Sequence, residues 1–172
     1  MNYGCFFYIC SMKASSISEL KKELQTLSPS RVLELCMCLT KYKKDNKELL
    51  SYLLFDAQDE EGYIQEVKEM IRGQFDTMNR STTYMATKTI RKILRNTNKY
   101  IKYSGNRQTE TELRIYFCIS LRQCGVIFHT SIAISNIFQR QLIKINSAIA
   151  SMHEDLQHDY REILKSEGLD KD

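Results

Sequence analysis

One segment of this sequence collects positive charge without any acidic residue to balance it. Between Thr77 and Thr109 there are eight lysines and arginines and no Asp or Glu, whereas the whole 172-residue chain has a net charge of +4. Lysine and arginine side chains neutralise phosphates along a nucleic-acid backbone, so this segment is a candidate anion or nucleic-acid contact. We call six of these residues the basic ridge: Lys88, Arg91, Lys92, Arg95, Lys99 and Lys102.

The spacing of the basic ridge favours one face of a single helix. At about 100° per residue, its six side chains fall within roughly a third of the helix circumference, and they extend over about 21 Å. Apolar residues such as Ile90, Ile93 and Ile101 fall on the opposite side. Three interpretations stay open. The ridge could meet backbone phosphates without sequence preference, it could contact an acidic protein partner, or it could be an ordinary surface face that is solvated or neutralised inside the fold. The acidic residues of the preceding segment that could neutralise it are Asp59, Glu60, Glu61, Glu66 and Glu69.

Catalytic and metal-binding motifs are weak throughout the chain. The segment from His153 to His158 resembles the zinc-protease motif H-E-x-x-H, but its second histidine comes one position late. Five residues apart on a helix, the two imidazoles would diverge by about 140°. The sequence also has no glycine-rich phosphate loop and no G-x-S-x-G motif. We therefore expect a protein that is not an enzyme, with no catalytic, cofactor-binding or metal-binding residues and no cofactor.

The cysteines are spaced neither as C-x-x-C pairs nor with histidines at zinc spacing. Cys118 lies in the apolar run 115–119, which favours a buried and reduced thiol. Reduced cysteines are typical of the cytoplasm, so we expect a cytoplasmic protein. The six cysteines are Cys5, Cys10, Cys36, Cys38, Cys118 and Cys124.

Helix signals recur along the chain. Capping boxes are expected at Ser16–Glu19, Asp45–Glu48 and Thr109–Glu112, and Gly105 is placed to end a helix in the left-handed conformation. Apolar side chains recur every three or four positions between these signals. The helices expected from this pattern are 17–27, 29–43, a helix opened by 45–48 with the leucines of 49–54 inside, 59–78, 82–104, 109–125, and 130–167 as one helix or as two with a break near His153.

These elements predict an all-α fold. With one proline, six glycines and 42% hydrophobic residues, the chain can form a packed helical domain of ordinary size. Short connections favour antiparallel neighbours, either in a bundle or in a short αα-superhelix in the manner of HEAT repeats, with about six to eight helices. We expect a single helical domain over 12–172. Residues 1–11 are expected to be a disordered or misassigned extension, which leaves open whether Met1 or Met12 is the true start.

Two longer stretches resemble an uncharacterised family of all-helical bacterial proteins. They are Leu27–Leu35 with Lys41–Leu50, and the region around Ile90–Leu94 with Tyr100–Gly105. The resemblance covers about half of the chain. It implies an all-α fold and a bacterial origin, and it implies no activity.

The function expected from these features is that of a helical interaction module that binds a protein partner. The alternative is a nucleic-acid-binding protein that uses the basic ridge from Lys88 to Lys102. A membrane partner is not expected, because the apolar face opposite the ridge is needed for the core. The sequence leaves the target and the oligomeric state open.

Overall fold

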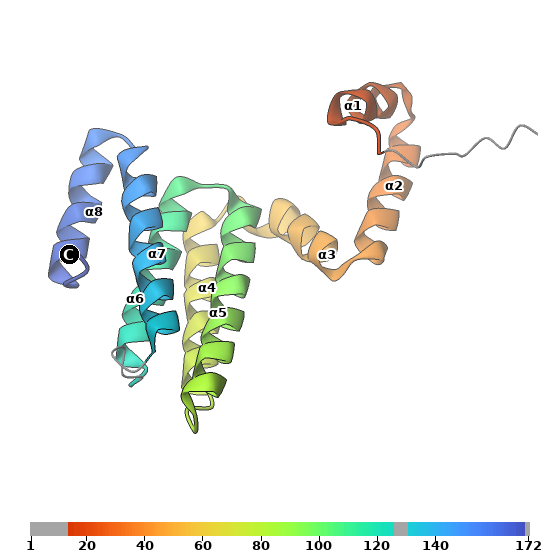
Figure 1. Ribbon diagram of the computed structural model, residues 1–172. Helices are drawn as coiled ribbons and strands as arrows, with labels where there is room; N and C mark the ends of the chain where they lie inside the picture. The colour runs from red at the N-terminus through yellow and green to blue at the C-terminus, as the bar shows by residue number, and fades with distance from the viewer. Residues whose placement is uncertain (1–13, 126–130, 171–172) are drawn as a thin grey trace, which may run out of the picture. The chain divides into compact units, whose positions relative to one another are not determined.

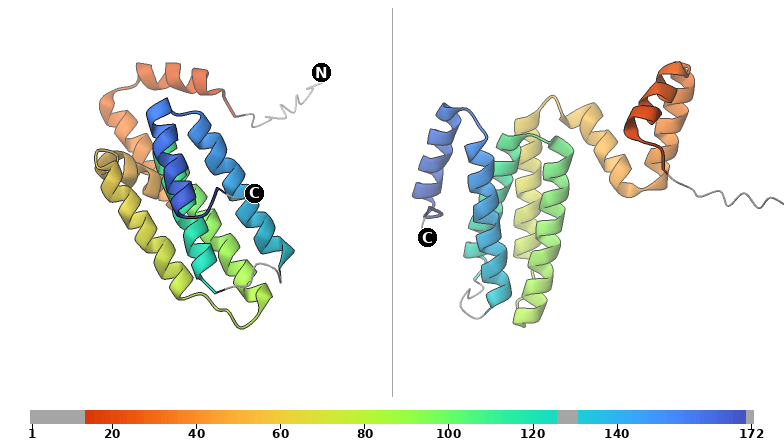
Figure 2. Two further views of the ribbon diagram at one scale, coloured as in Figure 1. Left: turned by 90° about the vertical axis from the view of Figure 1, so that its left-hand side faces the viewer. Right: turned by 45° about the horizontal axis from the view of Figure 1, so that its top comes forward.

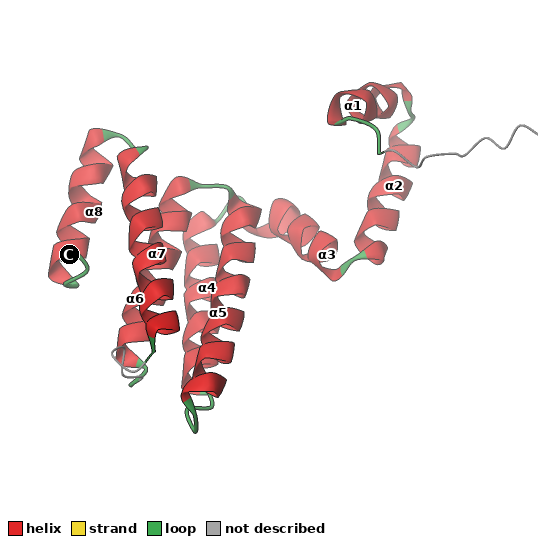
Figure 3. Ribbon diagram, in the orientation of Figure 1, coloured by secondary structure: helices red, strands yellow, loops and turns green. Residues whose placement is uncertain are grey.

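The protein is all-α, as the sequence predicts. The computed structural model describes residues 14–125 and 131–170, and these residues form helices and turns without any strand (Figure 3). Residues 1–11 and the alternative start at Met12 lie outside the described residues. The helices are α1 (Ile17–Thr26), α2 (Pro29–Tyr42), α3 (Lys44–Ser51), the π-helical turn η1 (Tyr52–Asp56), α4 (Glu60–Asp76), α5 (Thr83–Ser104), α6 (Arg107–Gln123), α7 (Ile132–Ala150) and α8 (Glu154–Ser166).

Several helix ends lie where the sequence places them. Ser16 and Glu19 form the expected capping box at the start of α1. At the end of α5, Gly105 has φ 66°, a left-handed conformation that favours glycine. The segment 130–167 divides into α7 and α8, and His153 is the residue that caps α8. Local capping chemistry therefore sets these boundaries.

Two of the expected capping boxes are wrong. Helix α3 begins at Lys44, so Asp45 lies in its first turn and does not cap it. Helix α6 begins at Arg107, because the Asn106 side chain accepts a hydrogen bond from the Gln108 amide at 2.8 Å. Thr109 is then inside the helix and fully buried. Asparagine caps a helix as well as threonine does. Asn106, three residues before Thr109, is therefore the residue that caps α6.

The chain divides into two compact units, Met1–Glu48 and Leu49–Asp172, where the sequence predicts one helical domain over 12–172. We call them the N-terminal and C-terminal units. The division follows from packing, since every closely packed pair of helices in the described residues belongs to the C-terminal unit. We describe each unit separately.

The C-terminal unit is an antiparallel bundle, one of the two architectures that the sequence predicts. Helices α4, α5, α6 and α7 lie side by side, and α6 packs against the other three (Figures 1 and 2). The antiparallel direction of α4 and α5 is fixed by two contacts, from the Tyr63 hydroxyl to the Tyr100 carbonyl and from the Asn96 amide to Gln74. Helix α8 packs on α7.

The core lies between these helices. Ile71 of α4, Ile93 of α5, Phe117 of α6 and Ile145 of α7 are all fully buried. The rings of Phe75 and Phe117 meet with centroids 5.7 Å apart. Each helix of the bundle contributes one apolar stripe, which recurs with the 3.6-residue period of a helix. The stripes bury each other in the core.

The N-terminal unit has helices but no buried side chain among its described residues. The expected stripe of α1 forms, yet Ile17 remains 85% exposed, and on α2 the side chain of Leu33 is 63% exposed. The leucines of 49–54 were expected inside, but Leu53 and Leu54 are exposed on η1 in the C-terminal unit. These apolar side chains therefore remain exposed to solvent.

Candidate functional site

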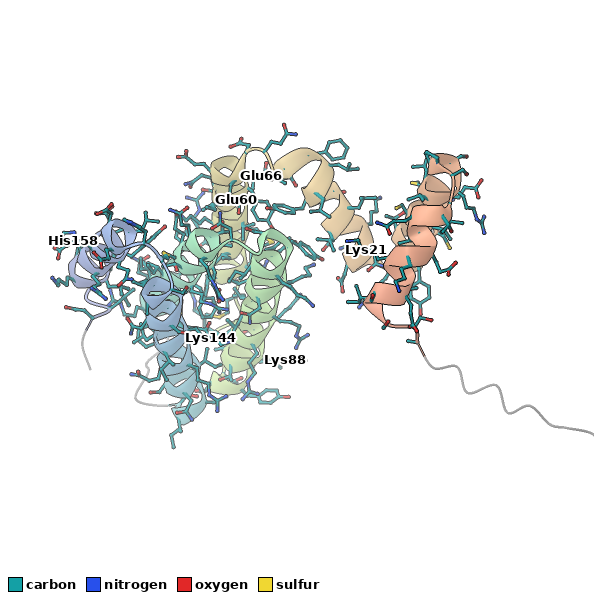
Figure 4. The ribbon with its side chains drawn as sticks, turned by 90° about the horizontal axis from the view of Figure 1, so that it is seen from above. Lys21, Glu60, Glu66, Lys88, Lys144 and His158 are labelled. Carbon is teal, nitrogen blue, oxygen red and sulfur yellow. The ribbon has the colours of Figure 1, made fainter. Side chains whose placement is uncertain are left out.

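The basic ridge forms a continuous feature on the outer face of α5. Ala86, Ile90, Ile93, Thr97 and Ile101 on the opposite face of that helix are buried. The ridge residues are exposed, except for one half-buried lysine near the C-terminal end of the helix. Figure 4 labels Lys88 on this face. The structure therefore brings all six expected residues, Lys88, Arg91, Lys92, Arg95, Lys99 and Lys102, to one surface.

Most of the ridge is not neutralised by the preceding helix. Within the described residues, no carboxylate lies within 4.0 Å of five of its cations, namely Lys88, Arg91, Lys92, Arg95 and Lys102.

Two of the acidic residues of α4 are engaged elsewhere. Glu69 pairs with Arg72 on the same helix. Glu60 accepts hydrogen bonds from the hydroxyls of Tyr52, Ser104 and Thr109. Burial raises the pKa of Glu60, but the hydroxyl donors outweigh burial and leave the pKa below its ordinary value. Glu60 is thus an ionised anchor that joins α4 to the ends of α5 and α6.

Lys99, the half-buried member of the ridge, lies against aromatic rings. Its Nζ is 4.9 Å from the centroid of the Tyr100 ring and 5.9 Å from that of Tyr103. The two rings meet edge to face at 5.8 Å. A cation held over ring faces is more restrained than a freely solvated lysine.

The structure extends the basic surface beyond the residues that the sequence singled out. Helix α7 packs against α5 and carries the exposed cations Arg140 and Lys144. Figure 4 shows Lys144 and Lys88 on the same side of the C-terminal unit. The signal was present in the sequence, because residues 113–153 also contain no Asp or Glu. The contact between α5 and α7 that brings these cations near the ridge is tertiary and has no local pattern in the sequence.

A second feature is a half-open cavity of about 430 Å³ between α4, α6 and α8. Pockets of roughly 300–1,000 Å³ suit small ligands. At its polar side, Lys68 pairs with Glu112 at 2.8 Å, and the Tyr160 hydroxyl donates to Glu112 at 3.4 Å. Burial raises the pKa of Tyr160 to about 12, so its hydroxyl keeps its proton at neutral pH. The lining is otherwise formed by Ile115, Tyr116, Ile119, Leu156, Asp159, Ile163 and Glu167.

The four described cysteines are all free, but they do not share one environment. Cys118 is buried as expected, and burial raises the pKa of its thiol to about 12. A thiol that stays protonated is a poor nucleophile. Cys38, by contrast, is exposed on α2.

The two histidines of the zinc-like motif both lie at α8. The ring of His153 accepts a hydrogen bond from the Asp155 amide as the cap of that helix, and His158 is exposed in its second turn. Within the described residues, no three His, Cys, Asp or Glu side chains gather closely enough to hold a metal ion. A helix with the length and apolar character needed to cross a bilayer does not occur in 14–125 or 131–170.

The third surface lies on the N-terminal unit. Eight large apolar side chains are exposed on α1 and α2 and at the end of α1, and we call them the apolar faces. Surface leucines scattered singly need no explanation, but eight exposed apolar side chains on two consecutive helices make these faces a candidate interaction site. Its members are Ile17, Leu20, Leu24, Leu27, Leu33, Met37, Leu39 and Tyr42.

No protein-family model, curated protein or solved structure matches the chain. This result is consistent with the resemblance to an uncharacterised family, which implies no activity. The function must therefore be argued from the three surfaces themselves.

Proposed function

We propose that this protein is a non-enzymatic helical interaction module that binds a protein partner through the apolar faces of α1 and α2. One observation carries the proposal: no described side chain in 14–48 is buried, and eight large apolar side chains there are exposed. Burying one such side chain contributes about 1.5–3 kcal/mol, so leaving eight in water is a substantial loss that a partner would recover.

The occupant that suits these faces is an amphipathic helix. On α1, the apolar residues Ile17, Leu20 and Leu24 follow each other at spacings of three and four, which makes a straight stripe. A stripe of this kind accepts the apolar stripe of another helix. The opposite face of α1 carries Lys22 and Gln25, which stay in water.

The double substitution Leu20→Glu/Leu24→Glu is expected to abolish partner binding. Two carboxylates would have to be buried without partners in the interface, which lowers affinity by at least about 100-fold. Isotope-labelled capture experiments from cells of the source organism would compare the wild type with this variant and quantify each captured protein.

The matched control is Lys22→Gln/Gln25→Glu, which changes the net charge by the same two units on the polar face of α1. It should capture the same partners as the wild type. Equal capture by all three proteins would contradict the proposal. Circular dichroism would establish that both variants keep the helices of the C-terminal unit.

A second candidate function is binding to a nucleic-acid backbone through α5 and α7. The observation that favours it is the set of exposed ridge cations with no carboxylate within ion-pair distance in the described residues, extended by Arg140 and Lys144 of α7. A contact of this kind would be sequence-neutral and dependent on salt.

For this candidate, the affinity for labelled single-stranded and duplex oligonucleotides is expected to fall steeply with salt. Six phosphate contacts predict a loss of about 10³-fold between 50 and 200 mM salt. The variant Lys88→Gln/Lys92→Gln/Arg95→Gln should reduce the slope of log K against log salt by about 3. Fluorescence anisotropy measures both quantities. The control Lys22→Gln/Lys41→Gln/Lys47→Gln removes the same charge from the N-terminal unit, and no binding at 50 mM salt would rule the candidate out.

We further propose that the protein acts in a bacterial cytoplasm. The support is the free state of the four described cysteines, which suits a reducing compartment, together with the resemblance to bacterial proteins.

A further inference from the structure

Helix α2 is apolar around most of its circumference. At 100° per residue, its charged side chains and Ser30 cluster in an arc of about 100° that also holds Cys38, and the other side chains, of which Thr40 and Tyr42 carry hydroxyls, fill an arc of about 220°. A helix on the surface of a globular protein normally shows an apolar stripe of about 100°. The members of the wide arc are Val32, Leu33, Leu35, Cys36, Met37, Leu39, Thr40 and Tyr42.

An arc of this width needs more than one neighbouring helix. A helix that is apolar all round is typical of a buried position, yet no side chain of α2 is buried. Helix α1 does not fill the place, because α1 and α2 are not among the closely packed helix pairs. The side chains on the two flanks of the arc, such as Leu33 and Leu39, are both exposed.

The area of the apolar faces matches what a stable dimer needs. A large apolar side chain removes about 60–120 Å² from water when it is fully buried, so eight of them supply at most roughly 500–1,000 Å². A standard specific interface buries about 800 Å² on each partner. The apolar faces are therefore large enough for one such interface without any contribution from the C-terminal unit.

The charges of the N-terminal unit do not oppose self-association. Residues 14–48 contain seven basic and five acidic residues, which gives a net charge of +2. Three of the acidic residues are already paired locally, in the pairs Arg31–Glu34, Lys43–Asp45 and Lys44–Glu48. Two such surfaces repel each other only weakly, because exposed charges of both signs are interspersed and screened by salt.

We propose that a second copy of this chain covers the apolar faces, so that α1 and α2 of two copies form a two-fold symmetric four-helix assembly. This inference rests on the proposed function and names its partner. In such an assembly each α2 gains α1 and α2 of the second copy as neighbours, and these are the neighbours that its wide arc requires. A two-fold interface uses the same patch on both copies, so the apolar faces need only complement themselves.

The test is sedimentation of the full-length chain between about 1 and 100 μM. The wild type is expected at twice the chain mass of 20.2 kDa. The variant Leu33→Glu/Leu39→Glu places a charge on each flank of the arc and should weaken the dimer by about 100-fold or more. Lys41→Glu is the matched control, since it changes the net charge equally within the polar arc of α2, and it should remain dimeric.

A wild type that sediments as a monomer at 100 μM would overturn the dimer, whatever the variants do. A dimer that survives Leu33→Glu/Leu39→Glu would also overturn it, because the contact would then lie elsewhere. If the wild type is monomeric but its capture of other proteins is lost in Leu20→Glu/Leu24→Glu, only the dimer fails and the proposed function stands. If that capture is unaffected as well, both fail.

Discussion

Replacement of Arg114 by methionine is expected to lower the free energy of unfolding by about 3–5 kcal/mol, as when one partner of a buried ion pair is removed. The Arg114 side chain is buried on α6. Its guanidinium donates to Glu110 at 2.9 and 3.0 Å. It also donates to Gln141 of α7 at 2.7 Å and to Asn98 of α5 at 2.9 Å. Methionine fills similar space but leaves these acceptors without their donor.

The Arg114→Met variant is also expected to lose part of the acid sensitivity of the wild type. Burial raises the pKa of Glu110, but the hydrogen bonds and charges of Arg114 and Arg107 outweigh burial, so the pKa lies below its ordinary value of 4.5. A lowered pKa stabilises the fold above pH 4.5, and this contribution is lost as the pH falls through the lower value. Without Arg114 the pKa returns upward and the loss between neutral and acid pH becomes smaller.

Urea unfolding followed by circular dichroism between pH 3 and 7 measures both effects. Arg107→Met is the matched control, because it removes the other arginine from Glu110 at a site whose side chain is 63% exposed, and it should cost no more than about 1 kcal/mol. Equal destabilisation by the two substitutions would contradict this prediction, because the buried network would then contribute no more to the free energy of unfolding than an exposed ion pair.

Replacement of Phe117 by alanine is expected to cost about 3–5 kcal/mol, the range for large-to-small changes in a packed core. Phe117 is fully buried on α6, the helix that packs against α4, α5 and α7, and its ring lies against Phe75. A cavity at this position removes contacts in the centre of the bundle. At about 2–4 °C for each kcal/mol in a chain of this size, the melting temperature should fall by roughly 6–20 °C.

Ile132→Ala is the control for this substitution, because Ile132 begins α7 with 81% of its surface exposed. Its effect should stay within about 0.5 kcal/mol. Thermal unfolding by calorimetry compares the two variants. A shift of less than 2 °C for Phe117→Ala would contradict the assignment of α6 as the central helix.

Helix α5 shows how much of the fold could be predicted from the sequence. Its start near Thr82, its end at Gly105 and its buried stripe through Ile90 and Ile93 all follow from local signals. The position of the basic ridge was equally predictable, because exposure opposite a buried stripe depends only on the helical period. The function of the ridge stays a prediction, since geometry alone does not show what it binds.

The polar network around Arg114 could not be predicted from the sequence. A lone arginine in a helix ordinarily indicates a solvated face, and Arg114 is buried only because acceptors from α5, α6 and α7 converge on it. Such convergence depends on tertiary packing and leaves no local pattern. The predicted start of α6 was wrong for a different reason. Asn106 and Thr109 are both good caps, and the choice between them is decided by which residues the core buries.

The apolar stripe of α1 was predicted correctly, but the expectation that this stripe is buried in a helical core was wrong. The helical period indicates which side chains share a face, and Ile17, Leu20 and Leu24 do share one. It does not say whether another part of the same chain will cover that face. No side chain of α1 or α2 is buried, and the chain divides into two units where the sequence predicts one domain.

The lack of a core in the N-terminal unit affects how it would associate. Isolated helices shorter than about 12–15 residues are marginal in water, and α1 and α2 have 10 and 14 residues. Their amides should therefore exchange with solvent far faster than those of the bundle. Association would have to order these helices as well as cover them, and the conformational entropy lost would offset part of the gain. The resulting complex would combine a broad contact with moderate affinity, a combination that allows rapid release.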